Sequence, residues 1–165
     1  LGTSSDDQAN RIATDSSGNI YVAGWTEGGL DGNTNAGDKD LFVVKYNSSG
    51  TKQWLRQLGT SSDDHANGVA TDSSGNVFVT GRSLGALDNN TYVNSEFFLI
   101  KYNSSGTKLW TKLSSSSQYD SAKGVAVVSS GFVYVTGETT GMDGNSTAGS
   151  YDLFLVKYNS SGIKQ

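Results

Sequence analysis

The chain has 165 residues, enough for one domain with a hydrophobic core, and it contains 21 glycines but no proline or cysteine. Its net charge of −4 and isoelectric point near 4.8 argue against a nucleic-acid partner, because phosphate binding needs clustered lysine and arginine. No apolar run approaches the ~20 residues of a membrane-spanning helix, and the short, evenly spaced apolar runs favour strands over disorder.

Three near copies of one unit fill the chain. The opening heptapeptide LGTSSDD returns at Leu58, and the hexapeptide KYNSSG occurs three times, at residues 45–50, 101–106 and 157–162. Such self-similarity indicates a repeat architecture in which each unit packs on the next. We expect the units at residues 1–57, 58–112 and 113–165. Because the chain begins with Leu1 and not with methionine, we also expect a processed product or a piece of a longer protein.

The residue pattern of each unit predicts two β-hairpins, and this pattern is clearest in the second unit. There the β-branched and aromatic runs 68–72 and 77–80 flank the turn SSGN, whose glycine permits a positive φ. The runs 97–102 and 107–112 flank the turn NSSG in the same way. We therefore interpret KYNSSG as the end of a strand followed by a turn.

Four antiparallel strands per unit, with a long connection between the second and third, are typical of a β-propeller blade. The stretches VATDSSGNVFVTG and LIKYNSSGTKLW resemble the bacterial SBBP-type β-propeller repeat and, more distantly, NHL-type blades. The resemblance covers all three units and implies an all-β propeller from a secreted or cell-surface protein, with no common catalytic motif. The leading hypothesis is a non-enzymatic binding or assembly scaffold whose partner is a carbohydrate or a protein.

The third unit predicts an incomplete blade, because only residues 163–165 stand where the earlier units have 51–57 and 107–112. Closed propellers usually have about four to eight blades, so three cannot close a ring, and each end would expose an apolar blade face. Two explanations stay open. The chain is a fragment of a longer array of blades, or consensus-like copies of it assemble head to tail into a closed ring.

The long loop of the first unit suggests calcium as a cofactor, because oxygen donors at alternate positions resemble the start of an EF-hand loop. The candidate ligands are Asp31, Asn33, Asn35, Asp38 and Asp40, with Asp143, Asn145 and Asp152 in the third unit. However, Phe42 stands where a bidentate glutamate is expected. Tight surface loops use the same residue types for side-chain to backbone hydrogen bonds, and that interpretation stays open.

Aromatic residues at variable positions are candidates for ligand binding. Trp25 is replaced by Arg82 and Glu138 in the other units, so packing does not dictate this residue. We expect Trp25, Tyr92 and Tyr151 to form an aromatic platform for a sugar or a peptide. The alternative is that these side chains are exposed and have no ligand.

Two other residue types recur in every complete unit. Trp54 and Trp110 stand in the fourth strands and predict packing between blades. Lys45, Lys101 and Lys157 close the third strands and are expected to be solvated or to lie at blade edges.

Acidic pairs at residues 6–7 and 63–64 precede the first strand of two units. Paired carboxylates serve glycoside hydrolysis, so a calcium-dependent glycan hydrolase or lyase is the alternative function. Adjacent residues in a strand point to opposite faces, however, which favours hydrogen bonds to nearby backbone. His65, the only histidine, replaces Gln8 and has no plausible catalytic partner in sequence. The departures from the repeat look scattered along the chain, and we therefore predict no catalytic residues.

Overall fold

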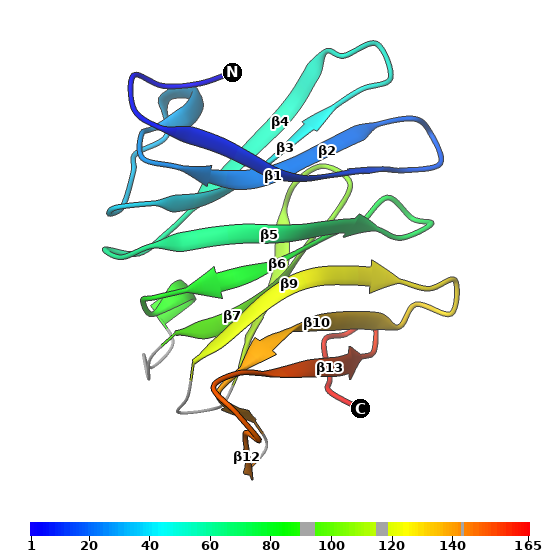
Figure 1. Cartoon of the computed structure of the whole chain (residues 1–165). Helices are drawn as coiled ribbons and strands as arrows, with labels where there is room; N and C mark the ends of the chain where they lie inside the picture. The colour runs from blue at the N-terminus through cyan, green and yellow to red at the C-terminus, as the bar shows by residue number, and fades with distance from the viewer. Residues whose placement is uncertain (90–94, 115–118, 143) are drawn as a thin grey trace.

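The computed structural model describes residues 1–89, 95–114, 119–142 and 144–165. The described chain is built from three antiparallel sheets stacked one on the next (Figure 1). This confirms the predicted all-β architecture of propeller blades. The first strands of the three blades, β1, β5 and β9, lie side by side along one side of the stack.

The strands follow one another outward within each blade. Blade 1 consists, in spatial order, of β1 (Asp7–Thr14), β2 (Ile20–Thr26), β3 (Asp40–Tyr46) and β4 (Lys52–Leu58). Blade 2 has the same order in β5 (Asp64–Thr71), β6 (Val77–Ser83), β7 (Glu96–Tyr102) and β8 (Lys108–Leu113). Two 3-10 turns, η1 (Leu30–Gly32) and η2 (Leu87–Asn89), lie in the long connections.

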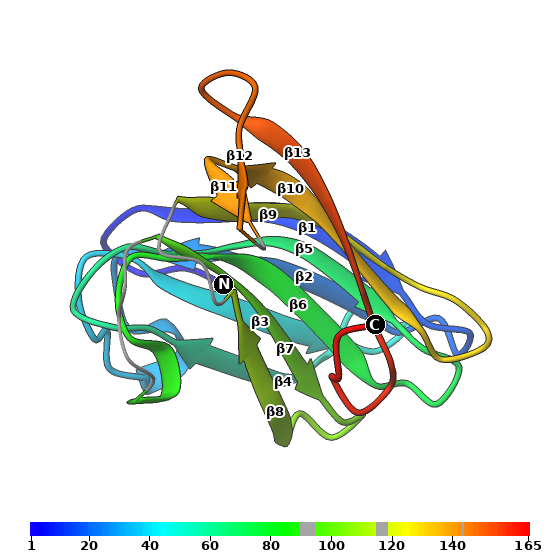
Figure 2. The same ribbon diagram turned by 90° about the horizontal axis from the view of Figure 1, so that it is seen from below.

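Blade 3 has three paired strands, β9 (Asp120–Val127), β10 (Val133–Thr139) and β13 (Asp152–Tyr158). A fourth strand is only begun, by an isolated bridge between Tyr158 and Lys164. The small hairpin of β11 (Gly141–Met142) and β12 (Asn145–Ser146) projects from this end of the molecule (Figure 2).

The hairpin turns form as the sequence predicts. An Asp or Asn side chain closes five of the six in the described chain, and the turn between β9 and β10 has Val128 in that place and only backbone hydrogen bonds. Asp15 Oδ1 accepts hydrogen bonds from the backbone N–H of Ser17 and of Asn19, at 2.9 and 3.0 Å. Asn47 Oδ1 likewise accepts from Ser49 N at 3.0 Å and from Thr51 N at 2.8 Å. A glycine with positive φ completes each turn, at a backbone conformation that other residues rarely adopt.

The hydrophobic core lies between the sheets, and each blade therefore needs a neighbour. Leu41 and Val43 of β3 face blade 2 and pack with Phe98, Ile100 and Tyr102 of β7. The next junction repeats this arrangement with side chains from the other face of β7 and from blade 3, where Phe97 and Phe154 stack with ring centroids 4.9 Å apart. Each fully buried side chain of this kind contributes about 1.5–3 kcal/mol.

The repeated hexapeptide also joins neighbouring blades, which its interpretation as a strand end and turn did not include. Lys45 Nζ donates to the carbonyl oxygen of Ser104, in the NSSG turn of the next blade, at 3.2 Å. Trp54 Nε1 donates to the same oxygen at 3.1 Å. Lys101 repeats the contact with the carbonyl of Ser160, again at 3.2 Å.

The predicted role of Trp54 and Trp110 in packing between blades is confirmed. Their rings lie over the NSSG turns of the following blades, at Gly106 and Gly162 respectively. The prediction for the lysines needs a correction, because Lys101 is buried and bonded to the next blade and is not a solvated charge.

Candidate functional site

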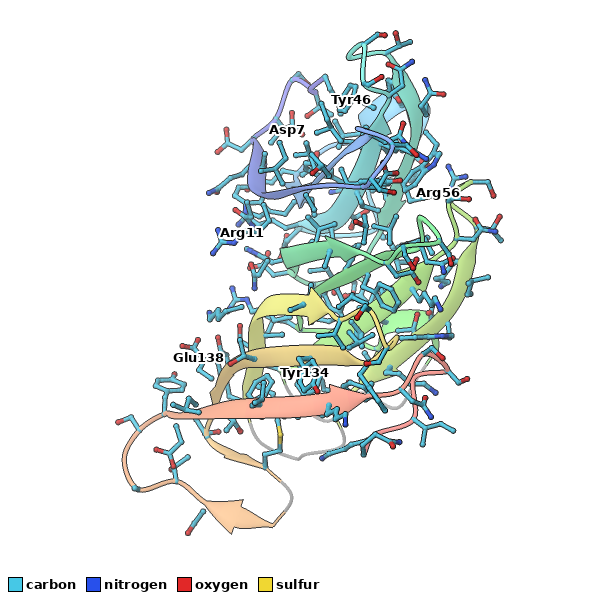
Figure 3. All side chains as sticks on the ribbon, turned by 90° about the vertical axis from the view of Figure 1, so that its right-hand side faces the viewer. Asp7, Arg11, Tyr46, Arg56, Tyr134 and Glu138 are labelled. Atoms are coloured by element: carbon cyan, nitrogen blue, oxygen red, sulfur yellow. The ribbon has the colours of Figure 1, made fainter. Side chains whose placement is uncertain are left out.

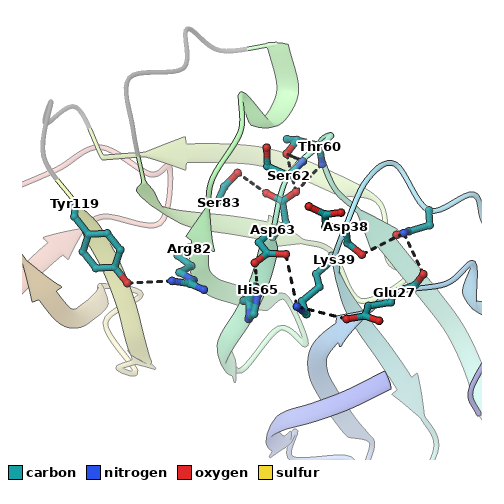
Figure 4. A network of polar contacts seen from close by, with 12 residues as sticks. Glu27, Asp38, Lys39, Thr60, Ser62, Asp63, His65, Arg82, Ser83 and Tyr119 are labelled. Atoms are coloured by element: carbon teal, nitrogen blue, oxygen red, sulfur yellow. Dashed lines mark hydrogen bonds and ion pairs between the residues drawn. The ribbon is translucent and has the colours of Figure 1, made fainter. Parts of the chain in front are cut away.

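A strip of aromatic and charged side chains crosses all three blades at one end of the inner strands. In blades 1 and 2, the rings of Trp25 and His65 lie 5.5 Å apart. His65 is the β-sheet partner of Arg82, whose Nη1 donates to the hydroxyl of Tyr119 at 3.2 Å. Tyr119 in turn contacts Tyr151 edge to face, with ring centroids 5.5 Å apart. Figure 4 shows the central part of this strip.

Lys39 is the charged centre of the strip at the junction of blades 1 and 2. Its Nζ lies 3.4 Å from Glu27 Oε1 and 3.8 Å from Asp63 Oδ1 (Figure 4). The same nitrogen lies 5.0 Å from the centroid of the Trp25 ring. The pair with Glu27 is within the connection before β3, and the pair with Asp63 joins this connection to the loop before β5. They therefore fix the long connection of blade 1 beside the indole ring.

A polar hollow of about 520 Å³ opens beside this end of the strip. Its lining comes from β1, β2, β5, β9 and the neighbouring loops and consists of Asp6, Gln8, Asn10, Arg11, Trp25, Glu27, Lys39, His65, Asn67 and Lys123. Figure 3 shows Arg11 and Glu138, which belong to the first and third blades, projecting from the same side of the molecule. Glu138 pairs with Lys123 at 2.9 Å.

The imidazole of His65 is held in its neutral form at the edge of this hollow. Burial lowers its pKa, the charge of Arg82 lowers it further, and the nearby Asp63 only partly offsets these effects. His65 Nε2 lies 3.8 Å from Asp63 Oδ2. Because Nε2 is buried, the neutral imidazole contributes ring surface beside the indole.

Asp7 and Asp64, the second acids of the two predicted pairs, hold their own loops. Asp64 Oδ2 accepts from the backbone N–H and the hydroxyl of Thr60, at 2.6 and 2.9 Å, and its other oxygen bonds to Ser83. Asp7 makes the equivalent bonds to Thr3 and Thr26.

The pKa values of these two acids move in opposite directions. Burial under blade 1 raises the pKa of Asp64 against the effect of its hydrogen bonds. For Asp7 burial also acts to raise the pKa, but the bonds from Thr26 and Thr3 outweigh it and lower the pKa. The pKa values differ in direction because blade 1 covers Asp64, whereas no blade of the described chain precedes Asp7.

The candidate calcium ligands of blade 1 do not converge on one point. Asp31 forms an ion pair with Lys52, and the amide of Asn33 donates to Leu30 O at 2.6 Å. Asn35 and Asp40 each keep one buried oxygen without a hydrogen-bond partner. No group of three or more acids, histidines or cysteines that could hold a metal is found in the described residues.

The other predicted site residues are dispersed. Tyr92 and Asp143 lie outside the described residues, as does the side chain of Asn145. Asp152 Oδ2 accepts from the backbone N–H of Ala148 at 3.0 Å, and Asp38 offers its carbonyl to Asn35. Of the predicted aromatic platform, Trp25 and Tyr151 occupy the two ends of the strip.

Sequence reasoning missed Lys39, Arg82 and Tyr119 as members of the site. Each of them stands where the three units differ: Lys39 corresponds to Ser95 and Tyr151, and Arg82 to Trp25 and Glu138. These departures from the repeat, which look scattered along the sequence, lie together at one end of the inner strands. Aligning the units and marking the variable positions would have found them.

The comparisons with known proteins agree with this architecture. The profile described as the beta-propeller repeat, SBBP, matches residues 1–31, 53–88 and 109–145, which is more than half of the chain. The chain belongs to the SBBP β-propeller repeat family. None of the helices among the described residues is long and apolar enough to cross a membrane.

The chain spans less than a fifth of the length of the two curated relatives that it matches. The chain is 27% identical, over 94% of its length, to the regulatory protein FlaEY of Caulobacter vibrioides, of which it spans 18%. It is 23% identical, over 99% of its length, to a WD repeat-containing protein of Acanthamoeba polyphaga mimivirus, of which it spans 16%. A solved structure of a luciferin-regenerating enzyme is similar at a TM-score of 0.36 and 14% identity, over 95% of this chain and 59% of that one.

Proposed function

We propose that this propeller segment is a non-enzymatic binding module whose ligand is a carbohydrate held in the hollow beside Trp25. The observation that carries the proposal is the position of this half-buried indole in the wall of a polar hollow, where the otherwise similar units differ. A binding site on a repeat scaffold has to break the repeat, because identical units offer identical surfaces.

The lining of the hollow fits a sugar better than a highly charged ligand. The lining has three cations and two acids beside the neutral imidazole of His65 and three amide side chains; the charged residues are Arg11, Lys39, Lys123, Asp6 and Glu27. Two of the amides, Asn10 and Asn67, donate to the carbonyls of Ala66 and Ala122, at 2.9 and 3.0 Å. Their own oxygens remain available as acceptors, so hydroxyl groups would find both donors and acceptors around an apolar ring.

The test is a printed array of neutral oligosaccharides, followed by calorimetry with the oligosaccharide that gives the strongest signal. Trp25→Ala is expected to lower the affinity at least tenfold, because it removes the stacking surface. Leu109→Ala, at an exposed position of β8, is the matched control and should bind as the parent does. Absence of binding across the array would overturn the proposal.

The same experiment separates binding from catalysis. Release of new reducing ends from the bound oligosaccharide would assign the chain to the alternative, a glycan hydrolase. We expect none, because Asp7 and Asp64 are already engaged by the threonines of their own loops. A glycan ligand also fits a secreted or surface module, since polysaccharides are exposed there.

A further inference from the structure

Each junction within the chain is formed by two side chains of one blade that insert into a hollow face of the next. Leu41 and Val43 project from β3 toward blade 2, and Phe97 and Leu99 project from β7 toward blade 3. All four are at most 2% exposed. We call such a pair the junction knobs.

Blade 3 presents the same pair with nothing packed on it among the described residues. Leu153 and Leu155 of β13 occupy the knob positions, as their pairing with Glu138 and Thr136 of β10 shows. They are 83% and 66% exposed. Nearly complete exposure of two leucines on one sheet face marks an interaction surface and not an ordinary surface strand.

The opposite end of the stack holds the matching socket. The outward face of blade 1 contains an apolar hollow of about 290 Å³, lined mainly by Ala9, Val22, Leu30, Phe42, Val44 and Tyr46. Leu30, Phe42 and Val44 are already buried within blade 1, whereas Ala9 is exposed and Val22 and Tyr46 are half-buried. In blade 2 the equivalents of all six positions are buried at the junction with blade 1. Figure 3 shows Tyr46 and Tyr134 in the two end blades.

Two further positions show that the socket is open. Ile12 points away from blade 2, because its neighbour Ala13 packs on the core of the first junction, and it is 68% exposed. Its equivalent in blade 2, Val69, is 8% exposed. Likewise, the position of a side chain at Gly50 has no atom within 4 Å, whereas Trp54 covers the equivalent Gly106.

The donor and the acceptor of the polar contact at a junction also lie at opposite ends of the stack, in blade 3 and in blade 1. Lys45 and Lys101 each donate to the NSSG turn of the following blade. Lys157 is the third copy of this lysine, and its Nζ lies 3.7 Å from the centroid of the Phe132 ring of its own blade. The NSSG turns of blades 2 and 3 accept these bonds, and the equivalent turn of blade 1 is the third copy of this acceptor.

We propose that the chain associates head to tail with a second copy of itself, the knobs of blade 3 entering the socket of blade 1. This surface lies apart from the glycan hollow, and the inference does not depend on carbohydrate binding. A second copy carries the complementary face for each end, because both internal junctions show this knob face covered by this socket face. Two copies joined at both junctions bring six blades together, within the range of about four to eight that closes a propeller.

The test is the solution mass of the chain by sedimentation equilibrium and light scattering, at concentrations up to about 100 μM. We expect a species of twice 17.4 kDa. Leu155→Asp and Ile12→Asp place a charge in the knob face and the socket face respectively, and each should raise the dissociation constant at least tenfold. The exposed Leu109→Asp on β8 is the matched control and should leave the mass unchanged.

A mixture of the two variants distinguishes this geometry from any other dimer. Leu155→Asp keeps an intact socket and Ile12→Asp keeps intact knobs, so the two together should form one good junction and associate where neither does alone. Circular dichroism of each variant checks that the sheets are retained. A monomer at every concentration, or a dimer that survives both variants, would overturn the proposal.

Discussion

Single carboxyl groups at the blade junctions make the stability of this protein depend on pH. Glu96 is buried at the second junction, and burial together with the neighbouring Asp120 raises its pKa from 4.5 to about 6. The folded protein therefore holds this proton more tightly than the unfolded chain does. The contribution of Glu96 is most favourable below the unfolded value of 4.5 and is lost as the pH rises through about 6, by up to about 2 kcal/mol.

Glu96→Gln removes this dependence, because the amide cannot ionise. We expect the variant to be more stable than the parent by up to about 2 kcal/mol above neutral pH, with the difference disappearing near pH 4.5. Denaturant unfolding of both proteins at a series of pH values measures it. His65 opposes the trend in both proteins, since its lowered pKa costs stability as the pH falls, and it cancels in the comparison.

A half-buried glutamate at the surface supplies the control. Glu138→Gln removes a carboxylate that pairs with Lys123 at 2.9 Å and should not reproduce the gain in stability of Glu96→Gln. A pH profile that is the same in the parent and in Glu96→Gln would contradict the assignment of the effect to the second junction.

Two glycines of the NSSG turns allow the free-energy cost of an unfavourable backbone conformation to be measured apart from the cost of overpacking. Gly50 and Gly106 have nearly the same positive φ, 78° and 81°. A side chain at Gly50 meets nothing, whereas one at Gly106 would lie 2.8 Å from the ring of Trp54. Gly50→Ala should therefore cost about 1–2 kcal/mol, and Gly106→Ala a further 1–3 kcal/mol from overpacking. Thermal or denaturant unfolding of the two variants measures the difference, and equal losses would mean that Trp54 does not cover the turn.

At the scale of elements, the long connection before β3 decides whether the protein needs a metal. Asp31 has its ion pair with Lys52, and the amide of Asn33 is bonded to Leu30 O, so neither points to a common centre with Asp40. We expect millimolar calcium to leave the midpoint of thermal unfolding unchanged. A rise in the midpoint that is lost in the double variant Asp31→Ala, Asp40→Ala would support the calcium hypothesis.

The sequence predicts the strands and turns because their signals are local. Asp15 and Asn47 close turns with backbone groups two and four residues away, so the turn can be inferred from a short stretch of the chain. The contacts of Lys45 and Trp54 with Ser104 could not be inferred in this way. Their acceptor is a backbone carbonyl of the next blade, and a carbonyl leaves no trace in the residue types.

The strip of aromatic and charged side chains could not be inferred from the sequence for a related reason. His65 and Arg82 are neighbours through strand pairing, but Trp25 and Tyr119 join them only because successive blades place equivalent ends of their strands side by side. The sequence pattern within one unit does not show which residues of successive blades lie side by side. Comparing the units position by position supplies it, since the strip occupies the places where they differ.

At the scale of the whole molecule, stability should be highest in the middle of the stack. Every residue of β7 in blade 2 is buried, because this strand has a neighbouring blade on both faces. β13 of blade 3 packs on one face only and leaves Leu153 and Leu155 in solvent. Local opening is easiest where the fewest apolar contacts are broken.

Hydrogen exchange by mass spectrometry tests this gradient. In the Leu155→Asp variant, amides of β6 and β7 should exchange only through global unfolding, while those of β10 and β13 exchange earlier through local opening of blade 3. In the parent protein a partner blade on the knobs should slow exchange in β10 and β13 and leave β6 and β7 unaffected. The opposite order, with blade 2 opening first, would show that the sheets fold as separate units and that the junctions contribute little to the stability of the stack.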